Sequence, residues 1–167
     1  MSGHPVYDIK RLAELAKNTL NENKSYFRKL RKKKPGNLDD IVGSVHNDVF
    51  GEINCLQCAN CCKTISPVLT NKDINRIAKR LRIKPSGVME QYLKIDEDDD
   101  YVFRQQPCPF LQDDNYCMIY EDRPKACREY PHTDRKKFHQ ILNLTLKNSE
   151  VCPAVFMVIE RLKKEIP

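Results

Sequence analysis

Apolar residues recur mostly at steps of three and four along the first thirty positions of the chain. Between Val6 and Leu30 they are Ile9, Leu12, Ala13, Ala16, Leu20, Tyr26, Phe27 and Leu30. Such spacing places the apolar side chains on one face of an α-helix. The pattern predicts one long amphipathic helix, which Pro35 and Gly36 bring to an end. We expect its apolar stripe to pack on the rest of the chain or on a partner protein.

A second, shorter helix is predicted over residues 38–50, and a loop rich in cysteine follows it. Asn37 stands in the N-cap position, where its side chain can accept a hydrogen bond from the first helical turn. The helix is expected to end near Gly51. Its apolar face is formed by Ile41, Val42, Val45 and Val49.

Two further helix starts lie in the middle of the chain. Thr70 is followed three residues later by Asp73, which is the spacing of a capping box, and this predicts a helix over residues 71–82. Pro85 has the fixed φ that suits a first helical turn, and it predicts a helix over residues 85–94.

The next segment changes character. The acidic run at residues 96–100 lacks the glycine and the distal glutamate of a calcium-binding EF-hand loop, so we interpret it as a solvated turn. Residues 101–120 hold short apolar runs around turn residues at 113–115, which predicts one or two short strands and a small β-hairpin. Pro124 and Pro153 then suit the starts of two more helices. The apolar stripe of the second comprises Val155, Phe156, Val158, Ile159 and Leu162.

The positive surplus behind the net charge of +6 lies wholly in the first 34 residues, since the remainder is slightly negative. That segment has ten Lys and Arg against three Asp and Glu, whereas the remainder has 19 against 20. The densest cations are Arg28, Lys29, Arg31, Lys32, Lys33 and Lys34. Such a run attracts phosphate, but cations at the end of a helix also complement its macrodipole. We favour the second interpretation, so nucleic acid is not an expected partner, whereas a protein partner for the helix is.

Nothing in the sequence indicates a membrane or export signal. No stretch approaches the roughly 18 apolar residues that span a bilayer, and the charged N-terminal segment lacks the apolar region of a secretory signal. We therefore predict a cytoplasmic protein without a membrane partner. Because the cytosol keeps thiols reduced, its cysteines indicate metal binding or catalysis rather than disulfides.

Four of the eight cysteines lie within the eight residues CLQCANCC. Repeated two-residue spacings let a tight loop aim several thiolates at one point, as in zinc sites and iron–sulfur sites. The candidate metal ligands are Cys55, Cys58, Cys61, Cys62, Cys108, Cys117, Cys127 and Cys152. Three closely spaced thiols with a remote fourth suit a four-iron cluster, and eight thiols divide equally well into two zinc sites.

Local charges are expected to favour the thiolate at two of the distant positions. Cys152 stands at a predicted helix start, where the positive end of the dipole lowers a thiol pKa. Cys127 lies close in sequence to Lys125 and Arg128, whose charges are expected to lower its pKa as well. Both effects produce the charged form that a metal requires.

Four segments of the chain together resemble the CxxCxxCC family of zinc- or iron-chelating proteins, which includes small YkgJ-type proteins. They are CLQCANCC, LTNKDINRIAKRL, PCPFL and CMIYEDRPKACREYP, and they cover roughly residues 53–153. The resemblance implies zinc or an iron–sulfur cluster, 4Fe–4S among the forms, as the bound cofactor. The ligands that it implies are Cys55, Cys58, Cys61, Cys62, Cys108, Cys117 and Cys127, together with Cys152.

The same family contains longer proteins regarded as lysine N-methylases of flagellin. This adds an enzymatic alternative, a metal-cluster-dependent protein lysine N-methyltransferase. The chain lacks the glycine-rich dinucleotide motif and the CxxxCxxC spacing of radical S-adenosylmethionine enzymes, and it has no P-loop, GxSxG or HExxH motif. A metal-stabilised interaction module with a basic helix is a third alternative. The sequence assigns no catalytic residues and leaves open whether the protein is an enzyme.

These observations predict a mainly α fold with a small β-hairpin. Residues 1–50 form an N-terminal helical extension, and residues 51–167 form a compact cysteine-cluster metal-binding domain, the two packing as one globular unit. The predicted function is that of a cytosolic metal-binding protein.

Overall fold

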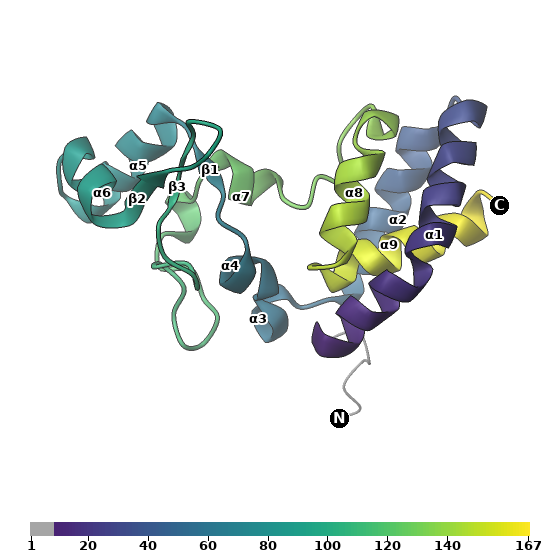
Figure 1. Cartoon of the computed structure of the whole chain (residues 1–167), viewed down its shortest axis with the longest axis horizontal. Helices are drawn as coiled ribbons and strands as arrows, with labels where there is room; N and C mark the ends of the chain where they lie inside the picture. Colours follow the sequence, from purple (N-terminus) through teal and green to yellow (C-terminus); the bar gives the residue numbers. More distant parts are fainter. Residues whose placement is uncertain (1–8) are drawn as a thin grey trace. The chain divides into compact units, whose positions relative to one another are not determined.

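Helices dominate residues 9–167, the part of the chain that the computed structural model describes (Figure 1). A small antiparallel sheet accompanies them, so the predicted fold class is confirmed. Contacts divide the described chain into two compact units. Residues 9–57 and 131–167 form the first, here called the helical unit, and residues 58–130 form the second, here called the cysteine unit. The predicted domains, residues 1–50 and 51–167, stay a prediction.

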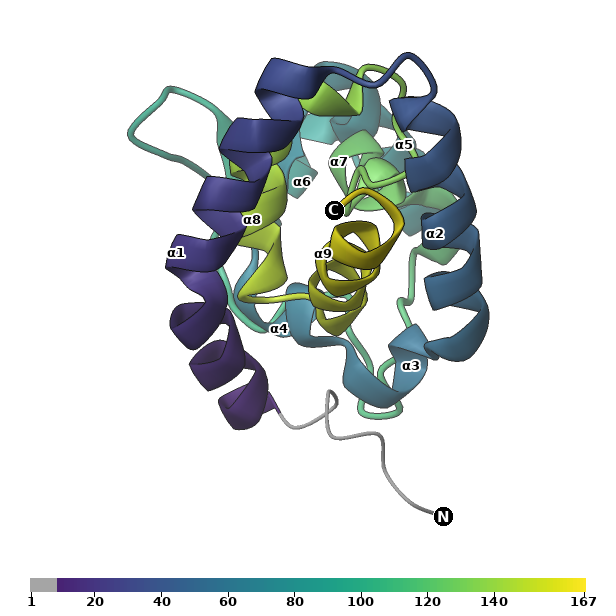
Figure 2. The ribbon, with the colours of Figure 1, turned by 90° about the vertical axis from the view of Figure 1, so that its right-hand side faces the viewer.

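The helical unit is built around its last helix. Its elements are α1 (Ile9–Lys33), α2 (Leu38–Glu52), the short η3 (Phe138–Gln140), α8 (Leu142–Ser149) and α9 (Pro153–Glu165). The helix α9 contacts α1, α2 and α8, and in Figure 2 it lies between α2 on one side and α1 with α8 on the other. The unit therefore joins segments from opposite ends of the chain.

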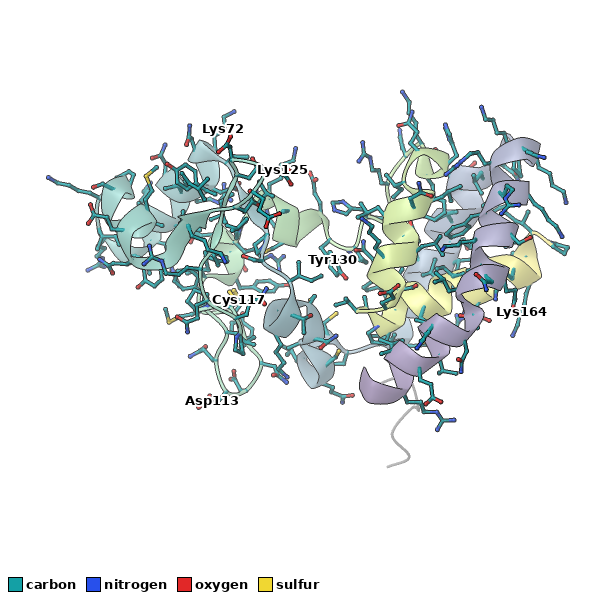
Figure 3. The ribbon with its side chains drawn as sticks, viewed as in Figure 1. Lys72, Asp113, Cys117, Lys125, Tyr130 and Lys164 are labelled. Carbon is teal, nitrogen blue, oxygen red and sulfur yellow. The ribbon has the colours of Figure 1, made fainter. Side chains whose placement is uncertain are left out.

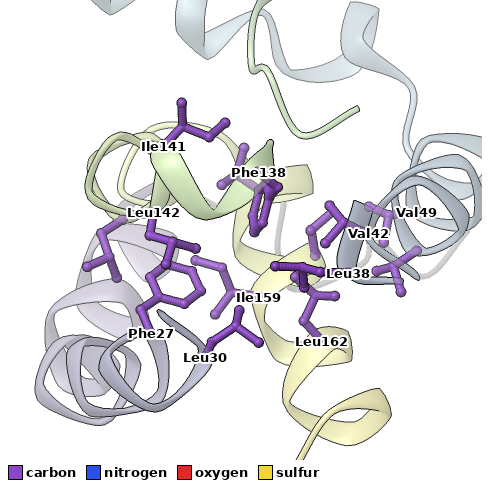
Figure 4. Packing of buried hydrophobic residues seen from close by; sticks show 14 of the residues in the cluster. Phe27, Leu30, Leu38, Val42, Val49, Phe138, Ile141, Leu142, Ile159 and Leu162 are labelled. Atoms are coloured by element: carbon purple, nitrogen blue, oxygen red, sulfur yellow. The ribbon is translucent and has the colours of Figure 1, made fainter. Parts of the chain in front are cut away.

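Large apolar side chains from all these elements meet in one core. Figure 4 shows Phe27 of α1, Phe138 of η3 and Ile159 of α9 within it. Each such side chain contributes roughly 1.5–3 kcal/mol when fully buried. The buried members are Phe27, Leu30, Leu38, Val42, Val45, Val49, Phe138, Ile141, Leu142, Leu146, Ala154, Val155, Val158, Ile159 and Leu162.

The predicted stripe of α1 is buried against its own chain in part, since Ala13 is exposed and Leu20 half-buried. Leu12 and Ala16 pack with Phe156 of α9 in a small cluster, while Phe27 and Leu30 enter the main core. The position of Val6 lies outside the described residues, as does the side chain of Ile9.

Two features of the helical unit differ from prediction. Asn37 occupies the N-cap position of α2, but its side chain makes no capping hydrogen bond. The helix α8 was not predicted, because Asn, Thr and Ser occupy half of the positions in its sequence LNLTLKNS and weaken its helix propensity. Packing overrides that weak propensity, since Leu142, Thr145 and Leu146 are all buried.

The cysteine unit combines short helices with the sheet. After α3 (Cys55–Cys58), whose last residue begins the unit, come α4 (Asn60–Thr64), β1 (Val68–Leu69), α5 (Asn71–Leu81), α6 (Pro85–Tyr92), β2 (Leu93–Ile95), β3 (Tyr101–Phe103), η2 (Tyr120–Asp122) and α7 (Lys125–Glu129). The strand order is β1-β3-β2, and both pairings are antiparallel. The buried core residues are Leu69, Ile74, Ile77, Ala78, Val88, Leu93, Phe103, Phe110 and Ile119.

The helix starts of this unit follow the sequence signals. Thr70 and Asp73 form the predicted capping box at the start of α5. The helix α6 begins at Pro85 as predicted but ends at Tyr92, two residues early, because Leu93 instead begins the strand β2.

The acidic run forms the turn of the β2–β3 hairpin, as predicted. The carboxylate of Asp96 accepts hydrogen bonds from the backbone N–H groups of Asp98 and Asp100, both at 3.0 Å. The sequence predicts the hairpin within residues 101–120, but its first strand, β2, lies before that segment. That segment contributes β3 and a single bridge between Leu111 and Cys117.

The cysteine run is helical rather than a loop, so the loop prediction is wrong. It forms α3 and α4, which are joined at Ala59. Ala59 has a φ of 48°, the left-handed conformation that lets the chain turn between two short helices.

Within residues 9–167, no helix has both the length and the apolar character needed to cross a lipid bilayer.

Candidate metal centre

Four thiols of the cysteine unit share one electrostatic environment. They are Cys62 of α4, Cys108 in the loop after β3, Cys117 in the bridge that follows, and Cys127 of α7. The charges of Cys62, Cys108 and Cys117 each act on the pKa of Cys127, and Cys62 and Cys117 act on that of Cys108. Because such effects weaken with distance, the four thiols lie within the range over which these charges act.

Backbone hydrogen bonds bring three of these segments together. The N–H of Cys108 donates to the carbonyl oxygen of Cys62 at 2.9 Å, which links α4 to the loop after β3. The N–H of Met118 donates to the carbonyl oxygen of Phe110 at 2.8 Å and links that loop to the next one. Figure 3 shows Cys117 at the base of this second loop and Asp113 near its tip.

Two of the thiols accept hydrogen bonds from backbone N–H groups. The donors are Phe110 and Leu111 for the sulfur of Cys108, and Ile119 for the sulfur of Cys117. Such bonds stabilise the thiolate over the thiol and tune the properties of any metal that it binds.

Burial nevertheless dominates three of the four pKa values. It raises the pKa of Cys108 to about 11 and that of Cys127 to about 12, and neighbouring thiolates raise both further. Burial raises the pKa of Cys117 as well. The pKa of Cys62 is lowered instead, to about 7, chiefly by a hydrogen bond from Cys61 and then by the charges of Arg123 and Lys63. A bound cation would offset the cost of placing these thiolates together.

The expectation that Lys125 and Arg128 lower the pKa of Cys127 is wrong. Both side chains are exposed, and neither is among the main charges that act on this thiol. The opposing charge is that of Arg123, whose effect on Cys127 is smaller than that of burial. Neighbours in sequence on a helix need not point toward the same side.

Arg123 is a component of this environment that sequence reasoning missed. Its guanidinium carbon lies 3.6 Å from the ring centroid of Tyr120, and its charge lowers the pKa of Cys62 and opposes the increases at Cys117 and Cys127. The available signal is the Arg-Pro pair of the string CMIYEDRPKACREYP, in which Arg123 lies four residues before Cys127.

The other four cysteines are not among the charges named above, although Cys61 makes the hydrogen bond that lowers the pKa of Cys62. Cys58 and Cys61 are half-buried in the cysteine unit. Cys55, which is exposed, and Cys152, which packs on the core of the helical unit, belong to that other unit. Cys152 stands at the N-cap of α9 as predicted. Throughout residues 9–167 the cysteines are thiols rather than disulfides.

The thiols do not form a closed coordination shell. Among the described side chains, no three Cys, His, Asp or Glu residues are grouped closely enough to hold a metal ion. The four coupled thiols are therefore neighbours whose sulfur atoms do not yet meet at one point.

Comparison with known sequences identifies the family. Residues 54–153 match the CxxCxxCC family, described as "Putative zinc- or iron-chelating domain", and the chain belongs to this family. Membership supports metal binding by the chain. The matched segment contains all eight cysteines.

A similar sequence occurs in an uncharacterized protein of Methanocaldococcus jannaschii. The two are 31% identical over 85 residues, which make up 48% of this chain and 44% of that protein. The chain thus spans less than half the length of this relative. No solved structure matches the chain.

Proposed function

We propose that the protein binds zinc or an iron–sulfur cluster through the thiolates of Cys62, Cys108, Cys117 and Cys127. The observation that carries this proposal is the mutual effect of these four half-buried thiols on one another's pKa. Grouping thiolates away from water costs free energy unless a cation accompanies them. A metal supplies that cation, and family membership supports metal binding independently.

The donor set fits both kinds of metal group. Structural zinc takes four thiolates in tetrahedral geometry, and a 4Fe–4S cluster also takes four. The N–H donors at Cys108 and Cys117 favour the thiolate form, and Arg123 offsets the net charge of −2 that Zn²⁺ leaves when bound to four thiolates. Binding requires the sulfur atoms to move closer together, because no three described ligand side chains are grouped closely enough to hold a metal ion.

The remaining cysteines stay candidate ligands on the strength of the sequence. They are Cys55, Cys58, Cys61 and Cys152. We also propose that the protein works in the cytosol, where thiols such as these persist in reduced form.

Metal and sulfide analysis tests the proposal. Protein purified under anaerobic conditions is expected to contain zinc, or iron with inorganic sulfide, and a brown colour with broad visible absorption indicates the cluster. Cys117→Ser is expected to lose this metal, whereas the matched variant Cys55→Ser, at an exposed cysteine of the other unit, keeps it. Well-folded wild-type protein without zinc or iron would overturn the proposal.

The alternatives of a lysine N-methyltransferase and an interaction module stay predictions. A calorimetric titration with S-adenosylmethionine tests the first, since the metal-loaded protein must bind the methyl donor to use it.

A further inference from the structure

Asp73 is a buried carboxylate whose two oxygens both accept hydrogen bonds. It is 1% exposed and lies in the first turn of α5. Its oxygens accept hydrogen bonds from the backbone N–H of Thr70 at 2.9 Å and from the hydroxyl of Thr70 at 2.7 Å. They also accept from Nη2 of Arg76 at 2.6 Å and from the backbone N–H of Lys125 at 3.0 Å. Only the bonds with Thr70 belong to the cap of α5.

The bond from Lys125 makes Asp73 the cap of a second helix. Lys125 is the first residue of α7, and Pro124, in the N-cap position, has no side chain that caps it. The carboxylate of Asp73 takes that place from another helix. With only five residues, α7 is too short to persist by its own hydrogen bonds, so its position depends on such contacts. Cys127 lies on this helix.

Arg76 holds the segment immediately before α7. Its Nε donates to the carbonyl oxygen of Asp122 at 3.2 Å, and its Nη2 donates to that of Arg123 at 2.8 Å. The same Nη2 bonds to Asp73, so the Asp73–Arg76 ion pair is hydrogen-bonded to the backbone of residues 122, 123 and 125 together. The guanidinium is suited to this because its donors form a rigid planar fork.

These contacts lead to the metal centre, although α5 carries no cysteine. The segment that the ion pair holds, residues 122–125, contains Arg123, whose charge acts on Cys62, Cys117 and Cys127. Cys127 follows two residues after this segment. We infer that Asp73 and Arg76 are positioning residues of the metal site, which set where Arg123 and Cys127 stand relative to Cys62, Cys108 and Cys117. The inference rests on the proposed function.

Zinc affinity of the full-length protein tests the inference. Metal-free wild type, Asp73→Asn and Arg76→Gln are titrated with zinc against a competing chelator, and the cobalt(II)–thiolate absorption of each is recorded. Residues that orient metal ligands typically change affinity by about 10–100-fold, and we expect losses in that range for both variants. The cobalt bands are expected to shift, because the thiolate geometry changes.

Thr70→Ala is the matched control. It removes a hydroxyl that caps α5 and bonds to Asp73, but Thr70 makes no hydrogen bond to residues 122–125 among those described. It therefore weakens the same helix start without releasing α7, and its zinc affinity and cobalt bands are expected to match wild type. Far-UV circular dichroism checks folding, and Arg76→Gln, at a half-buried side chain, provides the test if Asp73→Asn unfolds.

The two proposals fail in different ways. Wild type that binds neither zinc nor cobalt refutes the proposed function. If wild type binds zinc and Arg76→Gln binds it with equal affinity and unchanged cobalt bands, only the positioning role is refuted. Equal losses in Thr70→Ala and Arg76→Gln refute it as well, since they indicate a general weakening of α5.

Discussion

The backbone N–H of Cys108 donates to the carbonyl oxygen of Cys62 at 2.9 Å. This bond ties the last cysteine of the dense run to a loop that follows the sheet. The four coupled thiols therefore include one member of the run and three distant ones. The tertiary fold therefore places a cysteine of the dense run beside cysteines that are distant in the sequence.

Replacing Cys62 by serine is expected to remove the metal. A structural metal contributes on the order of 10 kcal/mol of binding free energy to folding, so the variant should also melt well below the wild type. Thermal unfolding with and without a chelator measures both effects. If chelation lowers the melting temperature of Cys62→Ser as much as that of wild type, the variant still binds metal and the assignment of Cys62 is wrong.

Arg123→Gln is expected to weaken metal binding by about tenfold, the lower end of the range for groups that support metal ligands. The charge of Arg123 favours the thiolate forms of Cys62, Cys117 and Cys127, and the glutamine variant lacks that charge. Chelator competition gives the affinity. Arg128→Gln is the control, since the exposed Arg128 lies on α7 but is not among the main charges acting on Cys127. A comparable loss in both variants would indicate a non-specific effect of net charge.

The stability contributed by Asp73 should depend on pH in a defined direction. Burial alone would raise its pKa, but hydrogen bonds from Thr70, Arg76 and the N–H of Lys125 outweigh burial and lower it to about 2. Because the pKa is lower in the folded protein, the ionised Asp73 stabilises the fold fully when the pH is above its unfolded-state pKa near 3.8. That contribution is lost as the pH falls toward 2. The difference corresponds to about 2 kcal/mol.

Urea unfolding of wild type and Asp73→Asn, both in excess chelator, measures this contribution. The chelator removes any metal from the comparison. The difference in the free energy of unfolding is expected to be constant between pH 7 and 5 and to shrink steadily below pH 4. A difference that grows on acidification would contradict the assigned direction.

Removing metal is expected to loosen the two units unequally. The core of the helical unit includes Phe138, Ile159 and Leu162, all fully buried, and it is larger than the core of the cysteine unit. Amide hydrogen exchange after chelation should therefore show lost protection in residues 58–130 and retained protection in α2 and α9. Equal loss in both units would show that the helical core is not independently stable.

Helix starts were predictable because their signals are local. The capping box of Thr70 and Asp73 and the prolines at 85 and 153 each lie within one turn of the structure that they specify. The helix α8 was missed because only its buried packing stabilises it.

The composition of the coupled thiol set was not predictable from spacing. It depends on contacts between distant segments, such as the bond between Cys108 and Cys62. The pKa of Cys127 was predicted in the wrong direction for a similar reason. Sequence displays nearby charges, here Lys125 and Arg128, but not the burial that outweighs them. The dual role of Asp73 at two helix starts is likewise invisible in a capping-box motif.

The central position of α9 has a consequence for synthesis on the ribosome. Its partners α1 and α2 emerge first, but the helix that they pack around is translated only after the whole cysteine unit. Their apolar faces therefore stay exposed to chaperones until α9 has left the exit tunnel. The cysteine unit is contiguous at residues 58–130, so it can fold and acquire its metal earlier.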